Sequence, residues 1–72
     1  MFYEDVRKIL KGAKKTDLFL LKFTRKDTGY KFKEIIMKKN LAIYDDYLEF
    51  WSANWSASQP LKNLDFIEKI TA

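Results

Sequence analysis

The chain has 72 residues, of which 47% are hydrophobic and 17% aromatic, and its net charge is +4. This length leaves room for one domain, residues 1–72, and the apolar content excludes a disordered chain. A domain of this size buries only about 60% of the surface that its unfolded chain exposes, so we expect surplus apolar side chains to mark an interface.

Positive charge is concentrated in the first half of the chain. Residues 1–39 hold 12 of the 14 basic residues and 5 of the 10 acidic ones, whereas residues 40–72 hold 2 and 5. This asymmetry predicts a basic surface for nucleic acid or an acidic partner. Twelve of the cations are Lys, which is equally typical of an ordinary solvated surface, because specific phosphate and base contacts favour Arg.

The sequence also bears on the compartment. The chain has no cysteine, which excludes a disulfide framework and a thiolate metal site and is typical of a reducing environment. Acidic Glu4 and Asp5 stand where a signal peptide carries positive charge. The longest uncharged apolar run, residues 18–21, is far below the roughly 20 residues of a membrane span. We therefore expect a cytoplasmic protein with no membrane association.

The first predicted element is an α-helix over about residues 3–14. Its apolar residues follow helical spacing along one face: Phe2, Val6, Ile9, Leu10 and Ala13. Acidic residues in the first turn and lysines near the end fit the helix dipole.

From residue 17 the apolar period changes to two, which predicts a strand over residues 17–25. Residues 26–29 predict a hairpin turn in which Gly29 supplies a positive φ, and the return strand covers residues 30–37. Near Glu34 the apolar positions shift to Ile35 and Met37, which indicates a bulge or a sharp bend.

The second half of the chain predicts shorter strands. We expect strands over residues 41–44 and 47–52, joined by a turn at Asp45 and Asp46, then a loop of small residues over 53–59. Residues 60–70 fit a short helix or an irregular turn at 60–63 followed by a strand at 64–70, and we favour the second. The predicted fold is α+β: an N-terminal helix followed by an antiparallel meander of four or five strands. Such a sheet would close into a small SH3-like barrel or pack one face on the helix.

The sequence gives little support to catalysis. Histidine and cysteine are both absent, which removes the commonest general base, nucleophile and metal ligands. Asp45 and Asp46 are typical turn residues rather than Mg²⁺ or Ca²⁺ ligands, and Gly12 and Gly29 lie too far apart for a phosphate loop. We expect no enzyme activity, catalytic residue, metal, cofactor or small-molecule substrate.

Two sets of residues are candidates for binding. Trp51 and Trp55 are candidates for a protein interface, because tryptophan is enriched at binding hot spots, although each could instead cover the core. The second set is basic. Its members could contact nucleic acid, helped by aromatic Tyr30 and Phe32 in the hairpin, or they could simply be solvated. They are Arg7, Lys8, Lys11, Lys14 and Lys15 in the helix, and Arg25, Lys31 and Lys33 in the hairpin.

The order of predicted elements resembles that of Sm-like barrels, such as the bacterial Sm-like RNA chaperone. Residues 44–50 are similar to the start of that family's third strand, and residues 61–67 take the place of its second motif. The likeness is mainly one of topology, because the family's Tyr-Lys-His signature reads Leu61-Lys62-Asn63 here. The resemblance implies a ring oligomer that binds RNA, with Lys62 in the RNA pocket.

Together these patterns predict a small non-catalytic binding or assembly module that acts through protein–protein interaction or self-association, with a homo-oligomer expected. The alternative is a small nucleic-acid-binding regulator that uses the basic helix face and the aromatic-basic hairpin.

Overall fold

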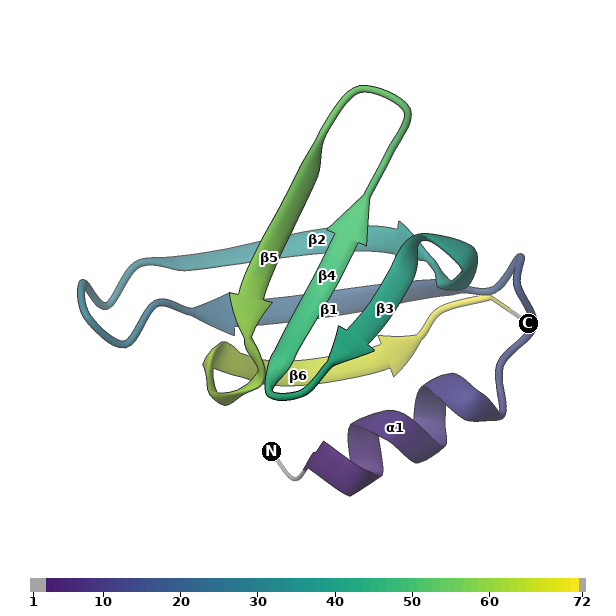
Figure 1. Cartoon of the computed structure of the whole chain (residues 1–72), viewed down its shortest axis with the longest axis horizontal. Helices are drawn as coiled ribbons and strands as arrows, with labels where there is room; N and C mark the ends of the chain where they lie inside the picture. Colours follow the sequence, from purple (N-terminus) through teal and green to yellow (C-terminus); the bar gives the residue numbers. More distant parts are fainter. Residues whose placement is uncertain (1–2, 72) are drawn as a thin grey trace.

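The computed structural model of the protein describes residues 3–71, in which one α-helix precedes six strands arranged in two antiparallel sheets (Figure 1). The helix is α1 (Tyr3–Lys11). The first sheet has the strand order β2-β1-β6 and contains β1 (Leu18–Thr24), β2 (Lys31–Met37) and β6 (Leu64–Lys69). The second sheet has the order β3-β4-β5 and contains β3 (Leu41–Tyr44), β4 (Tyr47–Trp51) and β5 (Ser56–Pro60).

The two sheets pack face to face, and their strands cross at a wide angle (Figure 1). Alternate side chains of each strand point inward, as the period of two requires. The core between the sheets contains Phe19, Leu21 and Phe23 from β1 and Leu48 and Phe50 from β4. Two 3-10 turns carry the chain between the sheets: η1 (Lys38–Asn40) leads from β2 to β3, and η2 (Leu61–Asn63) leads from β5 to β6.

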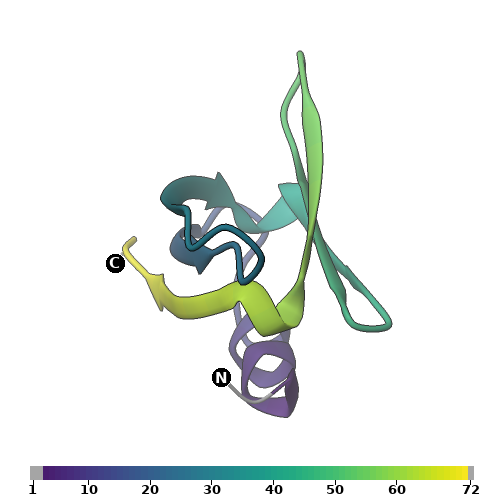
Figure 2. The same ribbon diagram turned by 90° about the vertical axis from the view of Figure 1, so that its left-hand side faces the viewer.

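Helix α1 lies below both sheets (Figure 2) and contributes buried Val6 and Leu10 to the core. Its buried apolar face is narrower than predicted, since Ile9 is 37% exposed. Phe2, which was predicted to belong to this face, lies outside the described residues. The helix ends at Lys11 instead of residue 14. The backbone N–H of Lys14 donates to Asp17 Oδ2 over 2.8 Å, which makes a tight turn where the helix was expected to continue.

Several local predictions are confirmed. Gly29 has a φ of 73° in the β1–β2 turn, and Asp45 has a φ of 51° in the turn between β3 and β4. The turn and strand favoured for residues 60–70 are present as η2 and β6. The predicted strands at 17–25, 30–37, 41–44 and 47–52 agree with β1 to β4 within about one residue at each end.

The α+β class is confirmed, but the predicted barrel is not closed. The edge strands are β2 and β6 in the first sheet and β3 and β5 in the second. No strand pairing within residues 3–71 joins one sheet to the other. The 3-10 turns η1 and η2 lie where the chain passes from one sheet to the other, in place of a continuous bent strand that would belong to both sheets.

The predicted loop at residues 53–59 is wrong over most of its length, because Ser56–Pro60 forms β5 and raises the number of strands above the predicted four or five. The residues of β5 are weak strand formers by intrinsic propensity. They pair with the apolar strand β4, where Phe50 lies opposite Ala57, so tertiary packing outweighs propensity.

The predicted shift of the apolar face near Glu34 is also wrong. The β1–β2 register is unbroken from Leu18 opposite Met37 to Thr24 opposite Lys31. Ile36 is the buried residue, and Ile35 points outward with 58% exposure. The bulge lies instead in β6: Phe23 is opposite Leu64 while Lys22 is opposite Phe66, which leaves Asp65 as the extra residue.

Candidate binding surfaces

The outer face of the first sheet carries an apolar patch. Ile35 is 58% exposed, Ile70 45% and Phe66 37%. Ile35 lies in β2, Phe66 in β6, and Ile70 directly after β6. Half-buried side chains complete the patch, whose members are Leu18, Leu20, Ile35, Met37, Phe66 and Ile70. In Figure 2, no described element lies over this face. A contiguous patch of this kind on a small domain usually marks an interaction site.

Three lysines occupy the other end of the same face. Lys22 and Lys33 lie directly opposite each other on β1 and β2. Lys31 is the next residue of β2 on the same face, nearer the β1–β2 turn. Like charges directly opposite each other are unfavourable. The ammonium of Lys22 lies 5.1 Å from the centre of the Phe66 ring, an arrangement that offsets part of this repulsion. We call the apolar patch, these lysines and Glu68 of β6 the basic face.

The outer face of the second sheet is aromatic and acidic. Tyr44 and Tyr47 lie opposite each other at the β3–β4 turn and are 60% and 51% exposed. Glu49 projects from the same side of β4, and residues 41–60 contain three acidic residues and no Lys or Arg. We call this surface the acidic face; its members are Ala42, Tyr44, Asp45, Asp46, Tyr47, Glu49, Trp51, Ser56, Ser58 and Pro60.

The two candidate tryptophans lie on opposite sides of the β4–β5 hairpin. Trp51 is half-buried. It follows buried Phe50 in β4, so its side chain points to the opposite side of the sheet and belongs to the acidic face. Trp55 is 42% exposed and packs edge-on against Phe50, with ring centres 5.8 Å apart. Trp55 therefore covers one end of the core, and the two residues do not form one surface.

Five aromatic rings form a column that crosses the core from Tyr30 to Trp55. The ring centres of Tyr30 and Phe32 are 5.7 Å apart, and those of Phe32 and Phe23 are 5.0 Å apart. Phe23 stacks on Phe50 at 5.5 Å, and Phe50 contacts Trp55. The first ring of the column, Tyr30, is 61% exposed, so a flat face is available next to the basic hairpin.

A shallow groove of about 400 Å³ lies beside this column. Its lysines supply the positive charge that single-stranded nucleic acid requires, but Phe23 is 1% exposed and Phe32 packs against the core, so base stacking would fall to the exposed ring of Tyr30. Asp65 at its rim accepts hydrogen bonds from the Thr24 hydroxyl and from Lys26, the latter over 3.4 Å. The groove is lined by Lys22, Phe23, Thr24, Lys31, Phe32, Lys33 and Asp65.

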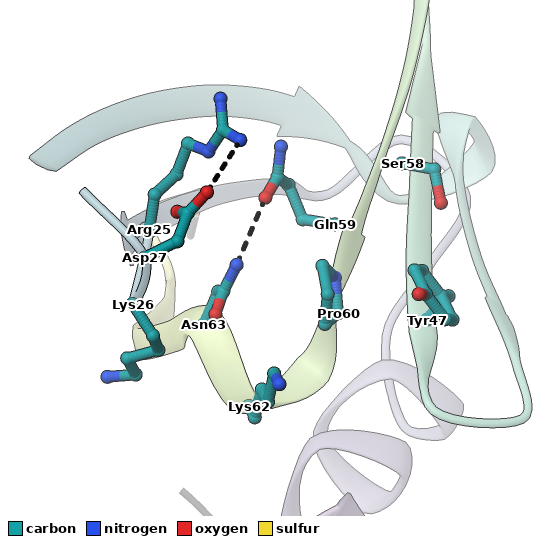
Figure 3. Close-up of a pocket in the computed structure, with 9 residues that line it drawn as sticks. All are labelled: Arg25, Lys26, Asp27, Tyr47, Ser58, Gln59, Pro60, Lys62 and Asn63. Carbon is teal, nitrogen blue, oxygen red and sulfur yellow. Dashed lines mark hydrogen bonds and ion pairs between the residues drawn. The ribbon is translucent and has the colours of Figure 1, made fainter. Parts of the chain in front are cut away.

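A second hollow, of about 390 Å³, lies between the β1–β2 turn and the β5–η2 segment (Figure 3). In it Arg25 pairs with Asp27 over 3.3 Å, and the buried Asn63 side-chain amide donates to Gln59 Oε1 over 3.3 Å. Lys62 is exposed at its rim and forms no ion pair with the described residues. The Sm-like resemblance places its RNA pocket at Lys62, but the other cations of this hollow are already engaged in pairs.

The basic candidates do not come together in one place. Arg7, Lys8 and Lys11 lie on α1 or at its end, and Arg7 donates to the Asp45 carbonyl over 2.9 Å. Lys14 and Lys15 lie in the turn before β1, whereas Arg25, Lys31 and Lys33 lie beyond its other end or beside it. Strand β1 has seven residues, so it separates Lys14 and Lys15 from Arg25 by about 23 Å.

Two carboxyl groups have shifted pKa values. The Lys14 backbone N–H, with help from Thr71 and Lys69, holds the pKa of the Asp17 carboxyl below its usual value. The Thr24 hydroxyl and Lys26 lower the pKa of Asp65 in the same way. Both are engaged in local structure: Asp17 ties the turn after α1 to the end of β6, and Asp65 fills the bulge.

Among residues 3–71 there is no group of three or more His, Cys, Asp or Glu side chains placed to hold a metal ion. The described part of the chain also contains no helix with the length and apolar character needed to cross a membrane. Comparisons of the chain with protein-family models, with curated proteins and with solved structures each find no match.

Sequence reasoning missed the basic face as a surface. The signal was present in the run of residues 18–21, which is apolar at every position, since such a run indicates a strand covered on both faces. The run at Ile35, Ile36 and Met37 carries the same signal on β2.

Proposed function

We propose that this chain is a non-catalytic module that self-associates through its basic face. The observation that carries this proposal is the exposure of three large apolar side chains, Ile35, Phe66 and Ile70, on one side of one sheet. In water, exposed apolar area of this kind is unfavourable, and its burial against another surface drives association. Half-buried Leu18, Leu20 and Met37 extend the patch across all three strands, as a well-packed interface core requires.

The two shifted carboxyl groups support a non-catalytic role. A general acid or base is most effective when its pKa is near neutral, which for a carboxyl requires an upward shift. Asp17 and Asp65 are shifted downward, each by hydrogen bonds that also hold the backbone in place.

The proposal is tested by replacing Ile35 with Ser and measuring molar mass against protein concentration by light scattering. Because Ile35 points outward, the fold should persist, and loss of its burial should weaken association at least about tenfold, the equivalent of roughly 1.4 kcal/mol. The matched control is Ile9→Ser, which removes an exposed isoleucine of helix α1. The proposal fails if Ile35→Ser and the wild type associate equally, or if Ile9→Ser is equally damaging.

A second candidate function is the binding of single-stranded nucleic acid along the hairpin groove. It is favoured by the exposed Tyr30 ring, which stacks on Phe32 at the end of the aromatic column, and by Lys31 and Lys33 of the same hairpin, whose side chains lie on the other face of the strand. Bases stack on such rings while lysines neutralise phosphates. Tyr30 lies outside the basic face, so Tyr30→Ala should weaken nucleic-acid binding and leave self-association unchanged. Binding through these lysines should also fall steeply with salt, and a salt-independent affinity would exclude this function.

A further inference from the structure

We infer that the basic face of one copy binds the acidic face of a second copy, so that copies of this chain join head to tail. This inference rests on the proposed function, because it names the partner of the same surface. It concerns the outer faces of the two sheets, which point to opposite sides of the molecule (Figure 2).

The two faces carry opposite charge. On the basic face, Lys22, Lys31 and Lys33 outnumber the acidic residues, which are Glu68 and, at the lysine end, Asp65, whose carboxylate pairs with Lys26. On the acidic face, Glu49 lies in the central strand, Asp45 and Asp46 lie in the adjoining turn, and residues 41–60 contain no Lys or Arg. Opposite potentials steer such surfaces together and set their register.

Like faces repel each other. Two basic faces in contact would bring together six lysines, two glutamates and two Asp65 carboxylates, and two acidic faces would bring together six acidic residues, with Arg7 at the edge of each face. Like-charge contacts disfavour a wrong pairing. The unlike pairing is therefore the one in which the apolar surface can be buried without charge repulsion.

The side-chain types of the two faces also match. The acidic face presents Tyr44 and Tyr47, which are 60% and 51% exposed, beside half-buried Trp51. Tyrosine and tryptophan offer large contact areas with few rotatable bonds and are enriched at interface cores. Their ring faces suit both the apolar patch and the lysine ammonium groups of the basic face.

The geometry then sets the form of the assembly. Since the two faces lie on opposite sides of one copy, a contact between unlike faces leaves one of each free. Such heterologous contacts continue until the chain of copies closes into a ring or grows as an open filament.

A mixing experiment with two variants tests this inference. Ile35→Lys blocks the basic face, Glu49→Lys blocks the acidic face, and Asp27→Lys in the exposed β1–β2 turn is the charge-matched control outside both. Circular dichroism first establishes that each variant is folded. Each blocked variant alone should remain at the monomer mass of 8.6 kDa, and an equimolar mixture should form a dimer and no larger species. The control should assemble like the wild type.

The outcomes separate the inference from the proposed function. If Glu49→Lys assembles like the wild type while Ile35→Lys does not, the basic face binds something other than the acidic face, and the inference alone is overturned. If neither variant associates and their mixture stays monomeric, the head-to-tail pairing is equally overturned. If Ile35→Lys assembles like the wild type, the proposed function fails as well. Should a lysine variant not fold, the milder pair Ile70→Ser and Tyr44→Ser, both at exposed positions, gives the same readout.

Discussion

The ammonium of Lys22 lies 5.1 Å from the centre of the Phe66 ring, and the two residues face each other across β1 and β6. This contact depends on the bulge at Asp65. In a regular strand Phe66 would share the inward face of Leu64, because side chains alternate with a period of two. The extra residue turns Phe66 outward and lets Ile67 take the inward position, so the bulge builds part of the basic face.

Because of the bulge, we expect substitutions of the neighbouring residues Phe66 and Ile67 to lower the free energy of unfolding by different amounts. Ile67 is 6% exposed, so Ile67→Ala should lower the free energy of unfolding by about 2–5 kcal/mol. Phe66 is 37% exposed, and Phe66→Ala should cost no more than about 1 kcal/mol through the lost contact with Lys22. Urea unfolding at a concentration where the protein is monomeric measures both. The reverse order of costs would show that Phe66 is the core residue.

The turn between β3 and β4 should tolerate glycine better than a branched residue. Asp45 has a φ of 51°, a left-handed conformation that Asp and Gly adopt far more readily than valine. Asp45→Val should therefore lower the unfolding free energy by about 1–2 kcal/mol. Asp45→Gly should be nearly neutral and is the matched control at the same position. Equal losses in both variants would point to the side chain of Asp45 instead of its backbone conformation.

Stability should fall at acid pH, in part through Asp17. Its folded pKa lies below the ordinary value of 3.8, so folding favours the ionised carboxylate. The resulting stability is fully present above the unfolded pKa and is lost as pH falls through the folded pKa. Asp65 contributes with the same sign.

This acid sensitivity is measured by thermal unfolding between about pH 2 and pH 6, the range that spans ordinary carboxyl titration. Asp17→Asn should flatten the pH dependence and should be less stable than the wild type near neutral pH. Asp27→Asn, in an exposed turn where the carboxylate pairs with Arg25, is the control. An Asp17→Asn curve parallel to that of the wild type over this range would contradict the account.

The two tryptophans should differ in what they support. Trp55 packs on Phe50 at the end of the core, so Trp55→Ala should lower stability by at least about 0.5–1.5 kcal/mol and leave association unchanged. Trp51 belongs to the acidic face, so Trp51→Ala should weaken association instead. Unfolding and light scattering on both variants distinguish the two roles. Loss of association in Trp55→Ala alone would place the interface at the end of the core.

Local signals in the sequence predict much of this fold. The helix, the turns at Gly29 and Asp45 and the strands β1 to β4 and β6 each have a periodic pattern or a turn residue that favours one conformation. Strand β5 has neither, since its small polar residues are held by their pairing with β4. Its presence depends on contacts that local propensity does not encode.

The candidate surfaces were less predictable than the fold. Whether Ile35 or Ile36 faces the core depends on the register with β1, and a change of one residue exchanges the two faces. The outward position of Phe66 depends on a bulge that becomes evident only in the pairing of β6 with β1. The tryptophans and the basic residues stood out by type, but their separation onto different sides of the molecule follows from the two-sheet arrangement.

The most direct test of the account is the molar mass of the wild-type protein in solution, measured by light scattering over a range of concentrations. It is measured at low and high salt, with and without a mixed pool of single-stranded nucleic acid. We expect a mass that rises above 8.6 kDa with protein concentration, persists at moderate salt and does not depend on nucleic acid. A mass that stays at 8.6 kDa at every concentration, or that rises only when nucleic acid is added at low salt, would contradict it.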